Sequence, residues 1–241
     1  MTDEPKRVVV TGGSTGIGLS IVELLLGDGF EIINLARRSV PIDDQRITNI
    51  EIDLCDRQAL QAACARISEM NVTRFVHNAG VVSPDLIEDV SLDDLDNLNQ
   101  LHLGAAVQLV QCLLASMKAQ SFGRIVLISS RASVGMKTRS SYSATKAGQI
   151  ALARTWALEL GEYGITANTV SPGPIQSTEM FHEIVPEQSP VLVEMAKKIP
   201  MKRLGEPDDV ARAVRFFLDA KNSFVTGQNL FVCGGTSIES G

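Results

Sequence analysis

The chain has 241 residues, 44% of them hydrophobic and 21% charged, which is enough for one large domain with a substantial core. Its formal net charge is −6, and lysine and arginine are scattered along it, so we expect a surface that repels nucleic acid. The start, MTDEPKRVVV, lacks the form of a signal peptide, and no run of 18 apolar residues follows it. We therefore expect a cytoplasmic protein without a membrane span.

Cysteine and histidine do not form a metal-binding pattern. The four cysteines are far apart and include no CxxC pair, and the three histidines are equally dispersed. Zinc sites require several such ligands at short spacings. We expect reduced core thiols and no metal.

Strand and helix patterns alternate along the whole chain. The apolar run Arg7–Thr11 predicts a strand covered on both faces, and a glycine-rich turn and an apolar helical stretch, IGLSIVELLLGDG, follow it. Further strands are expected at Glu31–Ala36 and Ile47–Asp53, in TRFVHNAG, GRIVLISS and GITANTVSPG, and in NLFV near the end. Helices are expected from Asp56 to about Glu69, from about Ser91 to Ala119, from the segment holding Tyr142 to about Gly161, and from near Pro207, with residues 174–200 irregular.

This alternation predicts an α/β fold. We expect a single domain over residues 1–241, with a Rossmann-type, doubly wound, mostly parallel sheet of about seven strands and helices on both faces. In such sheets, ligands bind outside the carboxyl ends of the strands. The residues that follow each strand are therefore the candidates for a functional site.

The turn after the first strand, TGGSTGIG, has the composition of a phosphate-binding turn. Its glycines allow tight turning and close approach to a pyrophosphate, and the following helix offers free N–H groups and a positive dipole end. The candidate cofactor residues here are Gly12, Ser14, Thr15, Gly16, Ile17 and Gly18.

The end of the second strand indicates which dinucleotide would bind. Enzymes that use NAD usually have an acidic residue here for the ribose 2′-hydroxyl, whereas this chain has Arg37 and Arg38, which suit a 2′-phosphate. Asp53 and Leu54 follow the third strand, where an adenine edge would rest. The fourth strand is followed by Asn78, Ala79 and Gly80.

The stretch SYSATKAG places Tyr142 and Lys146 four residues apart, on one face of a helix. One interpretation is an ordinary aromatic–lysine contact on a surface. The other is that the ammonium lowers the phenol pKa, so that Tyr142 can exchange a proton near neutral pH.

Taken together, TGGSTGIG, NAG (78–80), a serine closing the fifth strand, YSATK and SPGPI (171–175) resemble the short-chain dehydrogenase/reductase family, with the 3-oxoacyl-reductase-like members closest. The resemblance implies that Tyr142 is the catalytic acid or base, that Lys146 assists it and holds the nicotinamide ribose, and that Ser130 binds the substrate oxygen, with Ser129 as the rival. It also implies cofactor contacts from Pro172, Gly173 and Ile175, and from Thr178 or Ser177. The segment PIQST has one residue more than the family pattern, which leaves the choice between Thr178 and Ser177 open.

Two histidines depart from the family pattern. His77 stands where many relatives have asparagine, and we expect it only to fill space. His102 stands where the family has a helix asparagine that completes the catalytic group. The resemblance implies that this asparagine holds a water that links the lysine to solvent, and we expect neutral His102 to hold a similar water. Since the ordinary pKa of histidine is about 6.5, the imidazole would become charged at lower pH, and we expect the rate to fall on the acid side.

The resemblance implies an oxidoreductase that moves a hydride between NADP(H) and a carbonyl or secondary alcohol. Residues 179–200 are the expected lid, and its apolar residues suit a small hydrophobic or amphiphilic substrate: Phe181, Ile184, Val185, Val191, Leu192 and Met195. Arg131, Lys137 or Arg139 could meet a substrate carboxylate, or could be solvated surface charges. Two alternatives stay open: an NAD-dependent alcohol or sugar dehydrogenase, and a regulatory protein that binds cofactor with weakened catalysis.

The resemblance and the helix composition also bear on partners. The stretches AAVQLVQCLLASM and QIALARTWALEL are apolar on more than one face, so we expect one face to cover the sheet and another to meet a partner subunit. The resemblance implies that the assembly is a homotetramer or a homodimer. An acidic carrier protein is a less favoured partner, because Lys118 is the only basic residue at the ends of these two helices and the net charge is negative.

Overall fold

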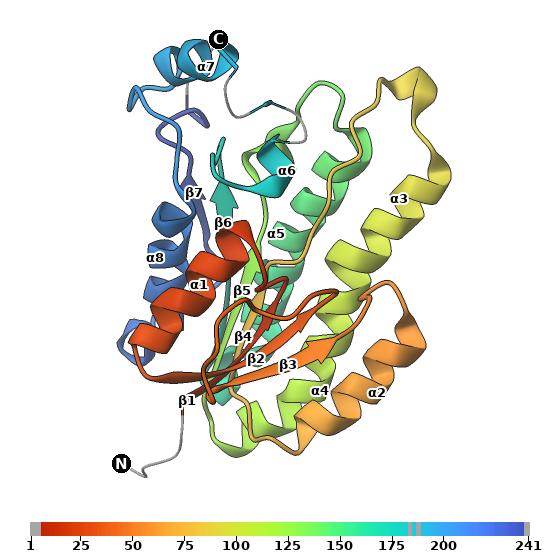
Figure 1. Ribbon diagram of the computed structural model, residues 1–241. Helices are drawn as coiled ribbons and strands as arrows, with labels where there is room; N and C mark the ends of the chain where they lie inside the picture. The colour runs from red at the N-terminus through yellow and green to blue at the C-terminus, as the bar shows by residue number, and fades with distance from the viewer. Residues whose placement is uncertain (1–5, 183–184, 187–188, 239–241) are drawn as a thin grey trace.

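The computed structural model describes residues 6–182, 185–186 and 189–238, and it contains one seven-stranded sheet (Figure 1). The strands are β1 (Lys6–Thr11), β2 (Phe30–Ala36), β3 (Ile47–Glu51), β4 (Arg74–His77), β5 (Gly123–Ile128), β6 (Ile165–Pro172) and β7 (Asn229–Val232). Their order is β3-β2-β1-β4-β5-β6-β7, and every neighbouring pair is parallel. The predicted doubly wound parallel sheet is confirmed.

Helices cover both faces of this sheet. One face packs against α1 (Gly16–Gly27) and α8 (Pro207–Leu218), and the other against α2 (Arg57–Ser68), α4 (Ala105–Ala119) and α5 (Ser140–Leu160). Successive residues of β1 alternate between these two cores: Val8 and Val10 belong to the first and Val9 to the second. Both faces of the strand are buried, which explains its unbroken apolar run.

The helix expected over residues 91–119 contains an irregularity that its sequence does not reveal. It consists of α3 (Leu92–Asn99), a π-turn, η2 (Gln100–Gly104), and α4. In the π-turn the Ala105 N–H donates to the Gln100 carbonyl, five residues back instead of four. We find that Leu92–Ala119 is long and apolar enough to cross a membrane by composition alone, but its inner residues Leu109, Leu113 and Met117 lie in the core. The apolar composition is therefore that of a core helix.

The segment expected to be irregular, 174–200, is partly helical. It contains α6 (Glu179–His182) and α7 (Val191–Lys198), which lie beyond the carboxyl ends of the strands (Figure 1). Pro190 starts α7 and Pro200 follows it, so only two turns fit between the prolines. Short 3₁₀ turns complete the described elements: η1 (Ile87–Asp89), η3 (Arg131–Val134), η4 (Gly161–Tyr163) and η5 (Ala220–Asn222). Ile184, expected in the lid, lies outside the described residues.

Candidate active site

A cavity of about 630 Å³ opens at the carboxyl ends of the strands. It brings together most of the residues expected from the sequence: Gly12, Ser14, Thr15, Gly16, Ile17, Arg37, Arg38, Asp53, Leu54, Asn78, Ala79, Gly80, Ser130, Tyr142, Lys146, Pro172, Gly173, Ile175 and Thr178. Gly18, His102 and Ser177 are not part of its wall. These three residues therefore bear on the cavity only through their neighbours.

The glycine-rich turn brings the start of α1 directly to the cavity. A Cβ atom at Gly18 would lie 1.9 Å from the Gly12 carbonyl oxygen, so no side chain fits there. Gly16 has φ +53°, and a Cβ there would press on Thr178 at 3.1 Å. In the part of the chain that the structure describes, the Thr15 side chain does not cap α1. The N–H groups of the first turn are thus free to bind an anion such as a pyrophosphate.

Two arginines form the rim beyond β2. Arg38 makes a two-pronged ion pair with Glu179 of α6, with nitrogen–oxygen distances of 3.2 and 2.7 Å. This pair ties the rim to the lid, and both side chains are well exposed, so it contributes little stability. Arg37 is exposed beside it and makes no ion pair with any residue in the described ranges. Its guanidinium is available to an anionic ligand in this part of the cavity.

The cavity wall after β4 is held by Thr11. The Thr11 hydroxyl accepts the N–H groups of Asn78 and Ala79, each at 3.0 Å, and its remaining proton goes to Nδ1 of His77 at 3.0 Å. The other ring nitrogen of His77 then donates to the Leu101 carbonyl at 3.0 Å. His77 thus does more than fill space, because it orients Thr11 and binds the π-turn. Burial lowers the pKa of His77 to about 3, so this ring is neutral.

The two serines after β5 have different surroundings. Ser129 is buried and its hydroxyl donates to the Lys146 carbonyl at 2.7 Å, on the neighbouring helix. Ser130 accepts the Ala132 N–H at 3.1 Å and also hydrogen-bonds Tyr142. Burial raises the pKa of Tyr142, and the hydrogen bond to Ser130 and the charge of Arg139 oppose that rise. The hydroxyl groups of Ser130 and Tyr142 therefore meet at the cavity.

Lys146 lies almost completely buried beneath Tyr142. It is 3% exposed, and its Nζ lies 5.6 Å from the centre of the Tyr142 ring. Burial lowers the pKa of Lys146 to about 7. No carboxylate among the described residues pairs with this ammonium.

His102 lies in the π-turn, packed edge-on to Tyr142 with 5.7 Å between ring centres. Thr145 donates its hydroxyl proton to the Tyr142 carbonyl, so it accepts from Nδ1 of His102 at 2.9 Å. Nε2 is then an acceptor and receives the Val81 N–H at 3.4 Å. Burial, with the positive charge of Lys146, lowers the pKa of His102 well below its usual value. The expectation that His102 titrates in the working pH range is wrong, because this imidazole is sealed from water.

The extra residue in PIQST forms a bulge. Ser177 has φ +59° and its hydroxyl turns to Glu206, at 3.3 Å, whereas Thr178 lines the cavity beside Gly16. The left-handed backbone at Ser177 thus absorbs the additional residue. Of the two candidates left open by the sequence, the structure puts Thr178 at the cavity.

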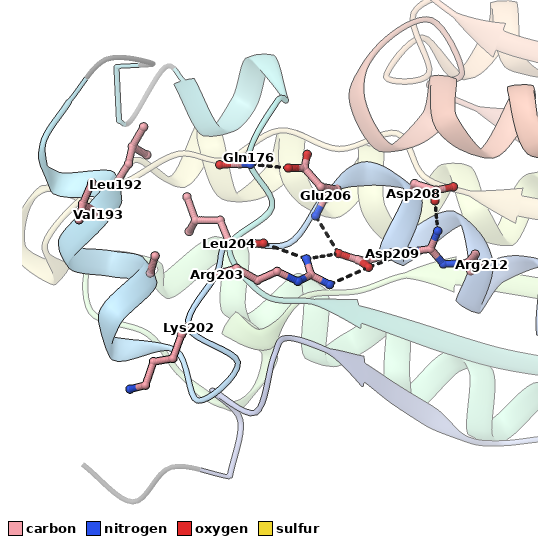
Figure 2. A pocket seen from close by; sticks show the side chains of 11 residues that line it. Gln176, Leu192, Val193, Lys202, Arg203, Leu204, Glu206, Asp208, Asp209 and Arg212 are labelled. Carbon is pink, nitrogen blue, oxygen red and sulfur yellow. Dashed lines mark hydrogen bonds and ion pairs between the residues drawn. The ribbon is translucent and has the colours of Figure 1, made fainter.

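A second cavity, of about 690 Å³, lies between α7 and the start of α8 (Figure 2). Its charged groups satisfy one another: Arg203 pairs with Asp209, Arg212 with Asp208 and Asp209, and Gln176 donates to Glu206. Lys202 points away from this network in Figure 2 and donates to the Lys197 carbonyl. These contacts anchor the segment that carries α6 and α7.

The substrate end of the cavity combines residues expected from the sequence with others that the sequence did not single out. Arg131 and Arg139 line the cavity beside Ser130 and Tyr142, whereas Lys137 does not. The expected lid residues Phe181, Val185 and Met195 line the cavity, whereas Val191 and Leu192 do not. Apolar liners that the sequence did not single out are Val81 and Val82 after β4, Met136 between η3 and α5, and Met180 of α6. Gln149 is completely buried next to Lys146. The only sequence signal for Gln149 is its position three residues after Lys146, on the same helix face.

Comparisons with known proteins agree with this arrangement. A family model described as enoyl-(acyl carrier protein) reductase matches residues 12–237. Among curated proteins, an acetoacetyl-CoA reductase of Synechocystis is 33% identical, with 96% of each chain covered. The (2S)-[(R)-hydroxy(phenyl)methyl]succinyl-CoA dehydrogenase subunit BbsD of Thauera aromatica is 30% identical, with 97% of each covered.

Solved structures give the same result. A structure titled short chain dehydrogenase/reductase family protein has a TM-score of 0.86 and 30% identity, covering 99% of this chain and 100% of that one. A structure titled ElxO with NADP bound has a TM-score of 0.90 and 25% identity, covering 98% and 100%. Both likenesses extend over nearly the whole chain.

Proposed function

Because the chain belongs to the short-chain dehydrogenase/reductase family of oxidoreductases, we propose that it transfers a hydride between NADP(H) and a carbonyl or secondary alcohol of a small amphiphilic substrate. One observation carries the proposal. Ser130, Tyr142 and Lys146 line the same cavity as a glycine-rich turn and a free helix N-terminus. The same cavity thus offers a proton donor for an oxygen and a cradle for a dinucleotide.

The described residues fit a nicotinamide cofactor. The start of α1 would hold the pyrophosphate, Asp53 and Leu54 the adenine, and Ile175 and Thr178 the carboxamide end. Arg37 and Arg38 stand where a carboxylate would select NAD, and they favour a 2′-phosphate. The relative solved with NADP supports the same choice. When bound, the reduced cofactor supplies the hydride.

The residues of the chain handle the proton. In reduction, the Tyr142 hydroxyl gives its proton to the substrate oxygen, and in oxidation the phenolate takes it back. A phenol pKa of about 10 is too high for this task, and burial raises it further. The Arg139 guanidinium opposes that rise, and the Lys146 ammonium, 5.6 Å from the ring centre, also favours the phenolate. The Ser130 hydroxyl donates to the substrate oxygen as negative charge develops on it.

The substrate end combines apolar walls with unpaired positive charge. Phe181, Val185 and Met195 come from the lid, while Arg131 and Arg139 flank Ser130 and Tyr142. No carboxylate within the described ranges forms an ion pair with either arginine. A ketone with an apolar body and a carboxylate suits this lining, and the name of the Thauera relative contains both a phenyl and a succinyl group.

The decisive experiment is a turnover assay with paired substrates and both cofactors. Ketones that carry a terminal carboxylate are compared with their methyl esters, using NADPH and NADH. We expect the acid with NADPH to have the highest kcat/KM, and Arg37→Asp to reverse the cofactor preference. Equal kcat/KM with both cofactors would favour the NAD-linked alcohol or sugar dehydrogenase, and binding of NADPH without turnover of any ketone would favour the regulatory protein.

A further inference from the structure

Gln149 is a buried amide on the same face of α5 as Lys146. It is 0% exposed, its Oε1 accepts from Lys146 Nζ at 3.3 Å, and its Nε2 donates to the His102 carbonyl at 3.1 Å. Only one orientation of the amide satisfies both contacts, because an ammonium can only donate and a carbonyl can only accept. Gln149 therefore bridges the π-turn and the ammonium with its oxygen toward the charge.

The π-turn explains why a side chain is needed at this place. Its wider hydrogen bonding, from the Ala105 N–H to the Gln100 carbonyl, leaves neighbouring carbonyls to side chains of other elements. His77 donates to the carbonyl of Leu101 and Gln149 donates to that of His102. Buried carbonyls without a donor are costly, so this half of the amide has a structural role. The other half faces Lys146.

Few groups near Lys146 can stabilise its charge. Its hydrogen-bond acceptors are the Ile128 carbonyl of β5 at 2.7 Å and the Gln149 amide. The titratable groups that face it are Tyr142 on its own helix, His102 in the π-turn and His77 on β4. Both imidazoles are held neutral, and the described residues supply no carboxylate. In this environment, loss of one hydrogen-bond acceptor destabilises the charged form of Lys146.

We propose that Gln149 is a positioning residue for Lys146, which holds the ammonium charged and aimed at the cavity through an amide bridge from the His102 carbonyl. The functional consequence rests on the proposed function, since Lys146 acts there on Tyr142 and on the bound cofactor. Gln149 itself does not touch the cavity. Its influence is expected in the protonation of Lys146.

Two substitutions of similar size distinguish the donor role of the Gln149 amide toward His102 from its acceptor role toward Lys146. Gln149→Leu removes both the donor to His102 and the acceptor to Lys146. Gln149→Glu also removes the donor when ionised, but it places a carboxylate where the acceptor was. If Gln149 had a purely structural role, the Lys146 pKa would change in the same direction in both variants. The proposed role predicts a lower Lys146 pKa in Gln149→Leu and a higher one in Gln149→Glu, each by about one unit or more.

The measurement is an NMR titration of the free protein with ¹³C-labelled lysine, with the Lys146 signal identified by its loss in Lys146→Met. It needs no cofactor or turnover. Gln61→Leu and Gln61→Glu, on the exposed face of α2, are matched controls that should leave the Lys146 pKa unchanged. Thermal melting reports the structural contribution separately. If Gln149→Leu does not fold, the comparison of Gln149→Glu with wild type decides.

Kinetics then connect this titration to the reaction. Lys146 is charged below its pKa, so the basic limb of kcat against pH should move to lower pH in Gln149→Leu and to higher pH in Gln149→Glu. Lys146 pKa values that are unchanged, or that move in the same direction in both variants, would overturn the proposal. Such a result would leave the proposed function standing, because that is tested by turnover of a ketone with NADPH, which this titration does not measure.

Discussion

Tyr142 and Tyr163 are the only tyrosines of the chain, and they form a matched pair for testing the chemistry. Tyr142→Phe removes the proposed proton donor while keeping the ring against His102, so kcat should fall by about a hundredfold or more. Cofactor affinity, measured by fluorescence titration, should change little. Tyr163→Phe, outside the cavity in η4, should keep wild-type turnover. Near-normal turnover of Tyr142→Phe would require another acid.

His102 should affect the pH dependence of the free energy of unfolding more than it affects the pH dependence of kcat. Its folded pKa lies well below the unfolded value of about 6.5, so below pH 6.5 the unfolded chain binds more protons than the folded one. This contribution is fully present above pH 6.5 and is lost as pH falls. His102→Asn should therefore lose up to about 2 kcal/mol less stability than wild type between pH 7 and 5, as measured by urea unfolding. The same loss in both proteins would contradict a neutral His102.

The rate profile provides a second test of His102. With a neutral ring throughout the working range, kcat against pH should have the same acid-side shape in wild type and in His102→Asn between pH 6 and 8. His102→Asn should keep most of its activity at pH 7–8, and His102→Ala should lose more. An acid limb that is present in wild type and absent from His102→Asn would show that the imidazole is accessible to protons after all.

At the level of residues, the sequence predicts what depends on local spacing and misses what depends on burial. The four-residue interval puts Tyr142 and Lys146 on one helix face whatever surrounds them. The neutral state of His102 and the role proposed for Gln149 depend on the removal of water by α3, the π-turn and β5, which the sequence does not display. A glutamine in a helix is normally expected on the surface.

Among the elements, the end of α8 depends on one buried arginine of β5. Arg124 is 1% exposed, and its guanidinium lies 4.3 Å from the centre of the Phe122 ring. It donates to the carbonyls of Asp219 and Ala220, which follow α8, and to that of Gly164 before β6. Arginine satisfies these carbonyls at the C-terminal end of the helix dipole.

Arg124→Met keeps much of the apolar contact but leaves these carbonyls without a charged donor. We expect a loss of roughly 2–4 kcal/mol in the free energy of unfolding, measured by chemical denaturation. Arg66→Met, on the exposed face of α2, is the matched control and should change stability by less than about 0.5 kcal/mol. A loss in Arg124→Met no larger than in the control would mean that water replaces the guanidinium.

Element boundaries show the same limits of the sequence. The periodicity of β1, α1 and α8 predicts them well, because the apolar pattern follows from one sheet covered on two faces. The π-turn interrupts the helix over 91–119 without any proline or break in apolar content, because tertiary contacts to its carbonyls from His77 and Gln149 stabilise it. In the sequence, the only sign of the bulge at Ser177 is that PIQST has one residue more than the family pattern.

For the whole molecule, exposed apolar side chains are spread over several elements, and two regions of them lie away from the cavity on α5 and beside β7. Leu158 of α5 is 88% exposed, on the helix that packs beside α4. Phe224 is 102% exposed, with Phe216 and Leu230 nearby on α8 and β7, where β7 is the last strand of the sheet. Contiguous exposed apolar surface often marks an interface, and an exposed edge strand favours association. We therefore predict self-association through both regions.

A closed tetramer with dihedral symmetry requires two different self-complementary interfaces, and these two regions are our candidates for them. We expect light scattering of the wild type to give four times the chain mass of 26.0 kDa at micromolar concentration. Leu158→Glu and Phe224→Glu each place charge in one region, so each should give a dimer, and the double variant a monomer. If the wild type has twice the chain mass, only one of the two regions is an interface. The single variant that gives a monomer then identifies that region. A wild-type monomer would contradict association altogether, because both regions would then be stable in water.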